Sequence, residues 1–158
     1  DVLAEERENL ITDLIEDTLN VLKATKISPT RICYYTAASW KWRVYRNLVA
    51  KAVEGEVKIN DVMKELAKDG TLRQNMKAVA SFVAKVLKAL SKLPNERKAR
   101  IAKIEMTNEK EIIEDALGFL KERFNAEVMV YGEENKTRYD PKQRATLATP
   151  SQPAIYVE

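Results

Sequence analysis

The sequence predicts an α/β (α+β) fold, with a small sheet of about three strands and five or so helices packed on it. Two short runs, 31–36 and 127–131, are rich in β-branched and aromatic residues and are typical of strands. Around them, apolar residues recur at helical spacing, which indicates amphipathic helices. Neither strand can bury both of its faces alone, so we expect the two to pair in one sheet that helices cover.

The helices and remaining strands are placed by periodicity and by the residues that begin and end such elements. Expected helix starts are marked by Thr36, by Asn60, by Thr71 with Gln74 and by Asn108 with Glu111, and Asn125 is expected to end the last helix. Helices are predicted over 4–24, 37–53, 60–69, 71–93, 97–103 and 108–124. Weaker strand patterns cover 102–106, 144–149 and 154–157.

Composition excludes most catalytic chemistry. The 158 residues include no histidine and one cysteine, Cys33, so the commonest general base and the usual zinc ligand sets are missing. No glycine-rich phosphate loop is present among the four glycines. We therefore expect a binding module without catalytic residues, metal or cofactor. With no disulfide, signal-peptide pattern or membrane-length apolar run, we expect it in the cytoplasm.

Charge is sorted along the chain. Residues 21–54 carry seven Lys or Arg and one acid, and residues 71–103 carry nine Lys or Arg and one acid. Residues 1–20 and 104–135 are acidic. One interpretation is that these segments neutralise each other within the fold. The other is that the basic segments form a face that attracts phosphates, and it is favoured by three lysines on one side of a helix that has no acid: Lys85, Lys88 and Lys92.

A run of aromatic and basic residues at 40–46 has the character of a nucleic-acid site. Stacking of bases on exposed rings, or of guanidinium groups on indole, suits nucleic acid. The alternative is that the rings pack into the core, and we favour it for Trp40. Lys41 and Arg43 remain candidates for phosphate contact.

The last residues form a proline-stiffened tail. Residues 154–157 are either an edge strand of the sheet or a segment that offers its main-chain groups to unpaired bases, and such bases are common targets of RNA-binding proteins.

Three stretches of the chain resemble the C-terminus of archaeal and eukaryal leucyl-tRNA synthetases. They are residues 32–37 with 40–42, residues 114–120 through 128–131, and the final residues 153–158. The resemblance covers nearly the whole chain in the same order. The HIGH-type and KMSKS motifs of the catalytic domain of that family are missing here, so the resemblance implies that aminoacylation does not reside in this segment.

The resemblance implies a single C-terminal tRNA-binding domain over 1–158, with 1–26 as an N-terminal linking helix and 134–158 as loop and tail. Its partners would be tRNA-Leu, whose long variable arm it would recognise, and the remainder of the synthetase chain. The residues implied at the tip of the arm are Ile155, Tyr156, Val157 and Glu158, with Tyr156 and Glu158 as side-chain contacts. Nearby phosphates would meet Lys136, Arg138, Lys142 and Arg144. The alternatives are a protein–protein interaction module of a synthetase complex and a remnant hydrolase or transferase.

Overall fold

The computed structural model describes residues 2–103 and 108–158, which form two compact units. The first unit combines the described residues up to Ala38 with those from 108 onward, and the second begins at Ser39 and ends before that segment. None of the described helices is both long enough and apolar enough to cross a membrane. The single domain predicted over 1–158 stays a prediction, and it would contain both units.

The first unit is built on a sheet with strand order β2-β1-β3. Strand β1 (Arg31–Thr36) pairs in parallel with β2 (Glu127–Gly132) and antiparallel with β3 (Ala154–Val157). The predicted pairing of the two apolar runs is therefore confirmed, and the tail is an edge strand. Because β1 is central, residues 32–36 are all buried.

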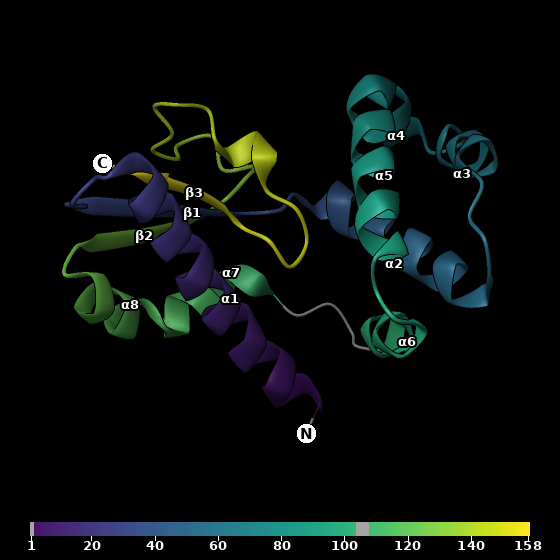
Figure 1. The fold of residues 1–158 in the computed structure, drawn as a ribbon. Coiled ribbons are helices and arrows are strands. Elements are labelled where there is room, and N and C mark those ends of the chain that lie inside the picture. The colour runs from purple at the N-terminus through teal and green to yellow at the C-terminus, as the bar shows by residue number, and fades with distance from the viewer. Residues whose placement is uncertain (1, 104–107) are drawn as a thin grey trace. The chain divides into compact units, whose positions relative to one another are not determined.

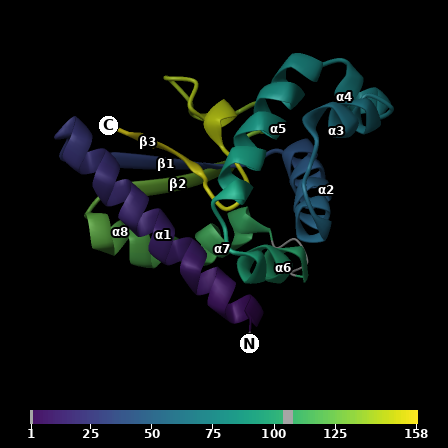
Figure 2. The same cartoon turned by 45° about the vertical axis from the view of Figure 1, so that its right-hand side comes forward.

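Each face of this sheet is covered by a different part of the chain (Figures 1 and 2). Helices α1 (Val2–Thr25), α7 (Glu109–Asp115) and α8 (Leu117–Phe124) pack on the face that carries Ile32 and Tyr34. The segment between β2 and β3, with the short 3-10 helix η1 (Ala145–Leu147), covers the face of Cys33 and Tyr35. The alternation of side chains along β1 thus divides the core of this unit into two layers.

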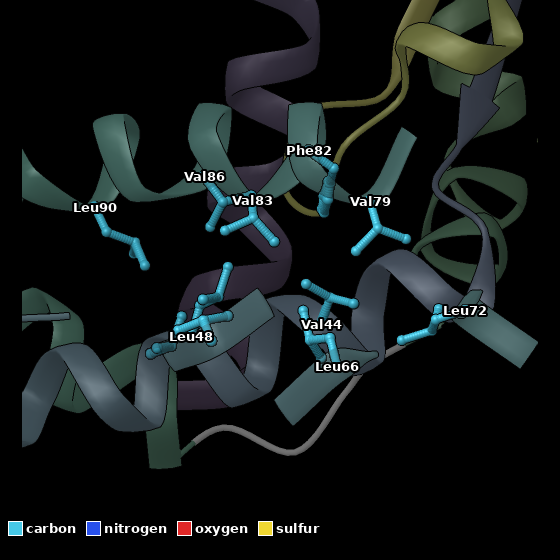
Figure 3. Packing of buried hydrophobic residues seen from close by; sticks show 11 residues of the cluster. Val44, Leu48, Leu66, Leu72, Val79, Phe82, Val83, Val86 and Leu90 are labelled. Carbon is cyan, nitrogen blue, oxygen red and sulfur yellow. The ribbon is translucent and has the colours of Figure 1, made fainter. Parts of the chain in front are cut away.

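The second unit is helical and has a core of its own. It comprises α2 (Ser39–Glu54), α3 (Ile59–Leu66), α4 (Gly70–Arg73), α5 (Met76–Ser91) and α6 (Asn95–Lys103). Figure 3 shows the apolar side chains of α5 directed toward Val44 and Leu48 of α2. The apolar residues that recur at helical spacing along α5 are buried at Val79, Phe82, Val83, Val86 and Leu90, and Leu87 packs beside them.

Three of the expected helix starts are wrong, and a capping side chain explains one of them. Thr36 is the last residue of β1, and α2 begins only at Ser39. The N-cap of α3 is Lys58, so Asn60 lies inside the helix. The Asp69 carboxylate accepts the Thr71 amide at 2.9 Å and caps the short α4, so the predicted helix over 71–93 is interrupted before α5.

One of the weaker strands is also corrected, and another lies mostly outside the described residues. Residues 144–149 contain the 3-10 helix η1, because the Asp140 carboxylate accepts the amides of Arg144 at 2.7 Å and Ala145 at 3.2 Å and holds the backbone in a turn. Residues 102 and 103 end α6, and the rest of the strand expected over 102–106 falls outside the described residues.

Both boundary residues of the last predicted helix are confirmed. Asn108 accepts the Glu111 amide at 3.3 Å, and Asn125 ends α8 with a left-handed φ of 49°. Between them the helix is divided at Ala116, which ends α7 and precedes α8.

Candidate nucleic-acid interface

Three charged residues lie side by side across the strands at one end of the sheet, where β1 begins and β3 ends (Figure 1). Arg31 and Glu158 exchange both main-chain hydrogen bonds, at 3.1 and 3.0 Å, so they are directly opposite each other. On the other side, Arg31 is in register with Glu127. The Arg31 guanidinium lies 3.2 Å from the Glu158 carboxylate and 3.6 Å from that of Glu127.

Tyr139, from the loop after β2, lies over this row of charges. The Arg31 guanidinium is 4.8 Å from the centroid of its ring. The Tyr139 hydroxyl donates to the Glu158 carboxylate, with 3.0 Å to each oxygen, and the Tyr156 hydroxyl donates to the same carboxylate at 2.9 Å. The Glu158 carboxylate therefore accepts from Arg31 and two tyrosines. We call these four residues, Arg31, Tyr139, Tyr156 and Glu158, the tyrosine cluster.

The surroundings of the cluster raise the pKa of each of its three donors. The hydrogen bond to Glu158, with burial, raises the pKa of Tyr139. Burial, with the same carboxylate, raises the pKa of Tyr156. Burial would lower the pKa of Arg31, but the carboxylates of Glu127 and Glu158 outweigh it, and the pKa is raised. One cation among two carboxylates makes this end of the sheet unsuited to holding a phosphate.

The tail itself presents an open strand edge. Since Arg31 and Glu158 form a hydrogen-bonded pair, the antiparallel alternation points the main-chain N–H and C=O groups of Ile155 and Val157 away from β1. No other segment pairs with this side of β3 among the described residues. The side chains are less available, because Val157 is buried and Ile155 packs into the core of the first unit.

The basic residues of the loop after β2 differ in their exposure and in their contacts. Lys136, Lys142 and Arg144 are exposed. Arg138 is held by the Asp140 carboxylate at 3.2 Å and by the carbonyl of Asn135 at 3.0 Å. Burial would raise the pKa of Asp140, but the Arg144 and Ala145 amides and Arg138 outweigh it and lower the pKa. Asp140 therefore fixes the loop on both sides of Lys142.

The lysines of α5 belong to the second unit. Lys85, Lys88 and Lys92 are exposed, and none of them forms an ion pair with a described residue. Lys88 and Lys92 lie at the end of α5, where cations interact favourably with the helix carbonyls. Lys85 lies a turn earlier, so this effect does not account for it.

The structure corrects one candidate, Lys41. It is only 5% exposed, and its ammonium group lies 5.8 and 5.9 Å from the ring centroids of Trp40 and Phe82. Because a phosphate contact needs an accessible cation, Lys41 is excluded from the proposed interface. Trp40 packs against the core, as expected. Arg43 is exposed and lies 3.4 Å from the Asp69 carboxylate, in an ion pair of the kind that contributes little.

The sequence-predicted residues are thus brought together in two groups, one in each unit. The first unit holds residues 155–158 and the basic residues of 136–144, and the second holds Arg43 and the α5 lysines. Sequence reasoning missed Arg31, Tyr139 and Asp140. The antiparallel register of the tail would have pointed to Arg31, but no local pattern marks Tyr139 or Asp140.

No protein-family model matches the chain. Curated relatives do match it along nearly its whole length. A leucine–tRNA ligase of Methanococcoides burtonii is 29% identical over 158 residues, which is 100% of this chain and 16% of that protein. A leucine–tRNA ligase of Pyrococcus abyssi is 32% identical over 155 residues, or 98% of this chain and 14% of that protein. A third, from Methanothermobacter thermautotrophicus, is 29% identical and covers 96% of this chain and 14% of that protein.

These matches extend through both units, and the chain spans only about one-seventh of the length of these relatives. A match of this extent is consistent with the C-terminal domain that the resemblance implied. The chain is therefore a homologue of one segment of the archaeal leucine–tRNA ligases.

Proposed function

We propose that this chain is a non-catalytic tRNA-binding domain of a leucyl-tRNA synthetase, and that it recognises the long variable arm of tRNA-Leu in support of leucine aminoacylation by the full enzyme. The homology to leucine–tRNA ligases supplies the class of partner. The single observation that carries the assignment of the recognition site is the open edge of β3. There the main-chain groups of Ile155 and Val157 face outward and are suited to hydrogen bonds with the edges of unpaired bases.

Phosphate contacts have a different role in this proposal. Exposed Lys136, Lys142 and Arg144 lie in the same unit as β3 and would bind the backbone near the tip of the arm. The α5 lysines would hold another part of the RNA backbone. Such contacts add affinity and orientation for any RNA, whereas the strand edge discriminates between RNAs.

Absence of catalysis is part of the proposal. The chain has no histidine, and the only buried carboxylate with a strongly raised pKa among the described residues is Glu109, which is bound to a main-chain amide.

The experiment compares binding of tRNA-Leu with binding of the same tRNA carrying a short variable arm. Wild-type chain is expected to prefer the long arm, and both affinities should fall as salt rises because counterions are released. Deleting residues 155–158 is a poor variant, because it removes β3 and the buried Val157. Ile155→Pro is a more selective variant, since it removes an outward N–H and leaves the hydrogen bonds to β1 in place.

Ile155→Ala is the matched control, because it loses the same side-chain packing and keeps the N–H. We expect Ile155→Pro to reduce the preference for the long arm roughly two- to tenfold, the effect of one main-chain hydrogen bond, and Ile155→Ala to retain it. Equal binding of the two tRNAs by the wild-type chain would overturn the proposed function.

The open edge also favours a second candidate, a protein-interaction module. An exposed edge strand can add a strand from another protein, and such pairing has a shallow salt dependence. If tRNA-Leu fails to bind and Ile155→Pro blocks binding of another segment of the synthetase, the protein-interaction function is supported instead.

A further inference from the structure

We propose that Tyr139 is a stacking platform for one unpaired nucleobase, and that Arg31 and Glu158 are positioning residues that hold its ring. This role deepens the proposed function and rests on it, because the base would come from the RNA bound at β3. It assigns the side-chain contact to a loop residue, and it gives Glu158 a supporting role in place of a direct contact with a base.

Tyr139 is the more exposed of the two tyrosines in the tyrosine cluster. It is 36% exposed, whereas Tyr156 is only partly exposed and packs on the core layer of Cys33 and Tyr35. Arg31 lies over one face of the Tyr139 ring, and Tyr156 meets the ring at an interplanar angle of 61°. The accessible surface of the ring is therefore left for another planar group.

Tyr139 is held through its hydroxyl and through its main chain. Its hydroxyl donates to the Glu158 carboxylate, and the Tyr139 main-chain carbonyl accepts a hydrogen bond from the Tyr35 hydroxyl. The next residue, Asp140, is fixed by Arg138 and by the amides of Arg144 and Ala145. Little freedom is then lost when a base stacks on Tyr139, and such preorganisation favours binding.

The chemistry of the site selects a base and not a phosphate. Glu127 and Glu158 flank Arg31, so its charge is already compensated. The Glu158 carboxylate accepts from three donors and has little remaining capacity for a base amino group. Since β3 ends at this cluster, a base on Tyr139 would lie beside nucleotides bound along the outward edge of Ile155 and Val157.

The first experiment uses the wild-type chain and needs no variant. A short single-stranded RNA of uridines with one central 5-iodouridine is irradiated with the chain, and the cross-linked peptide is sequenced. A stacked ring is the favoured partner, so we expect the cross-link on Tyr139. Failure of this RNA to bind, or a cross-link that maps elsewhere, would overturn the platform.

Variants then separate stacking from a structural role. Tyr139→Phe retains the ring and loses the bonds to Glu158, so a smaller loss is expected than for Tyr139→Leu, which should bind the RNA roughly five- to a hundredfold more weakly. The slope of affinity against salt should not change, because no phosphate contact is removed. Phe119→Leu is the control, since Phe119 is 57% exposed on α8, on the layer of helices that covers the opposite face of the sheet. Equal losses from Tyr139→Leu and Phe119→Leu, or an altered salt slope, would contradict base stacking.

Failure of this inference is distinguishable from failure of the proposed function. A chain that cross-links through Tyr139 but binds tRNA-Leu and its short-arm form equally has the platform without long-arm recognition. A chain that prefers the long arm but does not cross-link through Tyr139 has the proposed function without the platform.

Discussion

The Glu109 carboxylate accepts a hydrogen bond from the Ser151 main-chain amide at 3.0 Å, which ties the first residue of α7 to the turn before β3. Ser151 has a left-handed φ of 70° in this turn. Glu109 is 7% exposed, and its second oxygen, Oε1, has no hydrogen-bond partner among the described residues. Burial raises the pKa of Glu109 to about 8, although the Ser151 amide acts in the opposite direction.

This raised pKa predicts a pH-dependent stability. Between the ordinary value of 4.5 and about 8, Glu109 is protonated in the folded chain and ionised in the unfolded chain. The folded state then binds more protons, so the free energy of unfolding should fall as pH rises through this window, by up to about 1.4 kcal/mol per pH unit. Glu109→Gln should remove that part of the slope. Urea unfolding at a series of pH values measures it.

Glu111→Gln is the matched control, because Glu111 is exposed on the same helix and the same charge is removed. An unchanged pH slope in Glu109→Gln would show that Glu109 is not the group responsible.

Thr18 and Tyr34 join α1 to β1 through a buried hydrogen bond of 2.8 Å. The Thr18 hydroxyl donates its proton to the Leu14 carbonyl at 2.6 Å, so the Tyr34 hydroxyl is the donor to Thr18. Thr18→Val leaves that donor buried without a partner and should destabilise by roughly 1–3 kcal/mol, whereas Tyr34→Phe should cost about 1 kcal/mol. Urea unfolding of both variants and of the double variant tests this. The double variant should cost less than the sum, and strict additivity would contradict the bond.

Asn125 ends α8 in the left-handed region, with φ 49°. Asn125→Ala should destabilise the chain by roughly 1–2 kcal/mol, because a Cβ without a compensating side-chain hydrogen bond is strained there. Asn125→Gly should be neutral or slightly stabilising. Thermal unfolding measures both. Asn20→Ala is the control, because Asn20 lies within α1, where Ala should be slightly stabilising. A similar loss of stability in Asn125→Ala and Asn20→Ala would contradict the role of the left-handed conformation.

The exposed lysines of α5 are expected to contact phosphates without reading sequence. Replacing Lys85, Lys88 and Lys92 by Gln should weaken binding of long-arm and short-arm tRNAs alike and reduce the salt slope by up to about 3. Filter binding at several salt concentrations measures both effects. The charge-matched control replaces three other exposed lysines of the same unit by Gln: Lys58, Lys64 and Lys68. Equal effects of the two triple variants would indicate only a general electrostatic attraction.

Much of the local structure was predictable because its causes are local. Two strands, the apolar stripe of α5 and the boundaries at Asn108 and Asn125 all follow from neighbouring residues. The wrong predictions arose where a nearby side chain competed for the same amides. Asp69 caps α4 in place of the expected capping box of Thr71 and Gln74. Asp140 holds residues that were expected to form a strand in a turn.

What the sequence by itself determined was the type of most elements, the lack of histidine chemistry and the separation of basic from acidic segments. Only the tertiary structure decided which residues meet: Arg31, Tyr139 and Glu158 at one end of the sheet, Lys41 inside the helical unit and the outward edge of β3. The physical reason is that side-chain periodicity specifies the faces of one element. Strand order, register and loop docking depend instead on contacts between residues far apart in the sequence, as between Arg31 and Glu158.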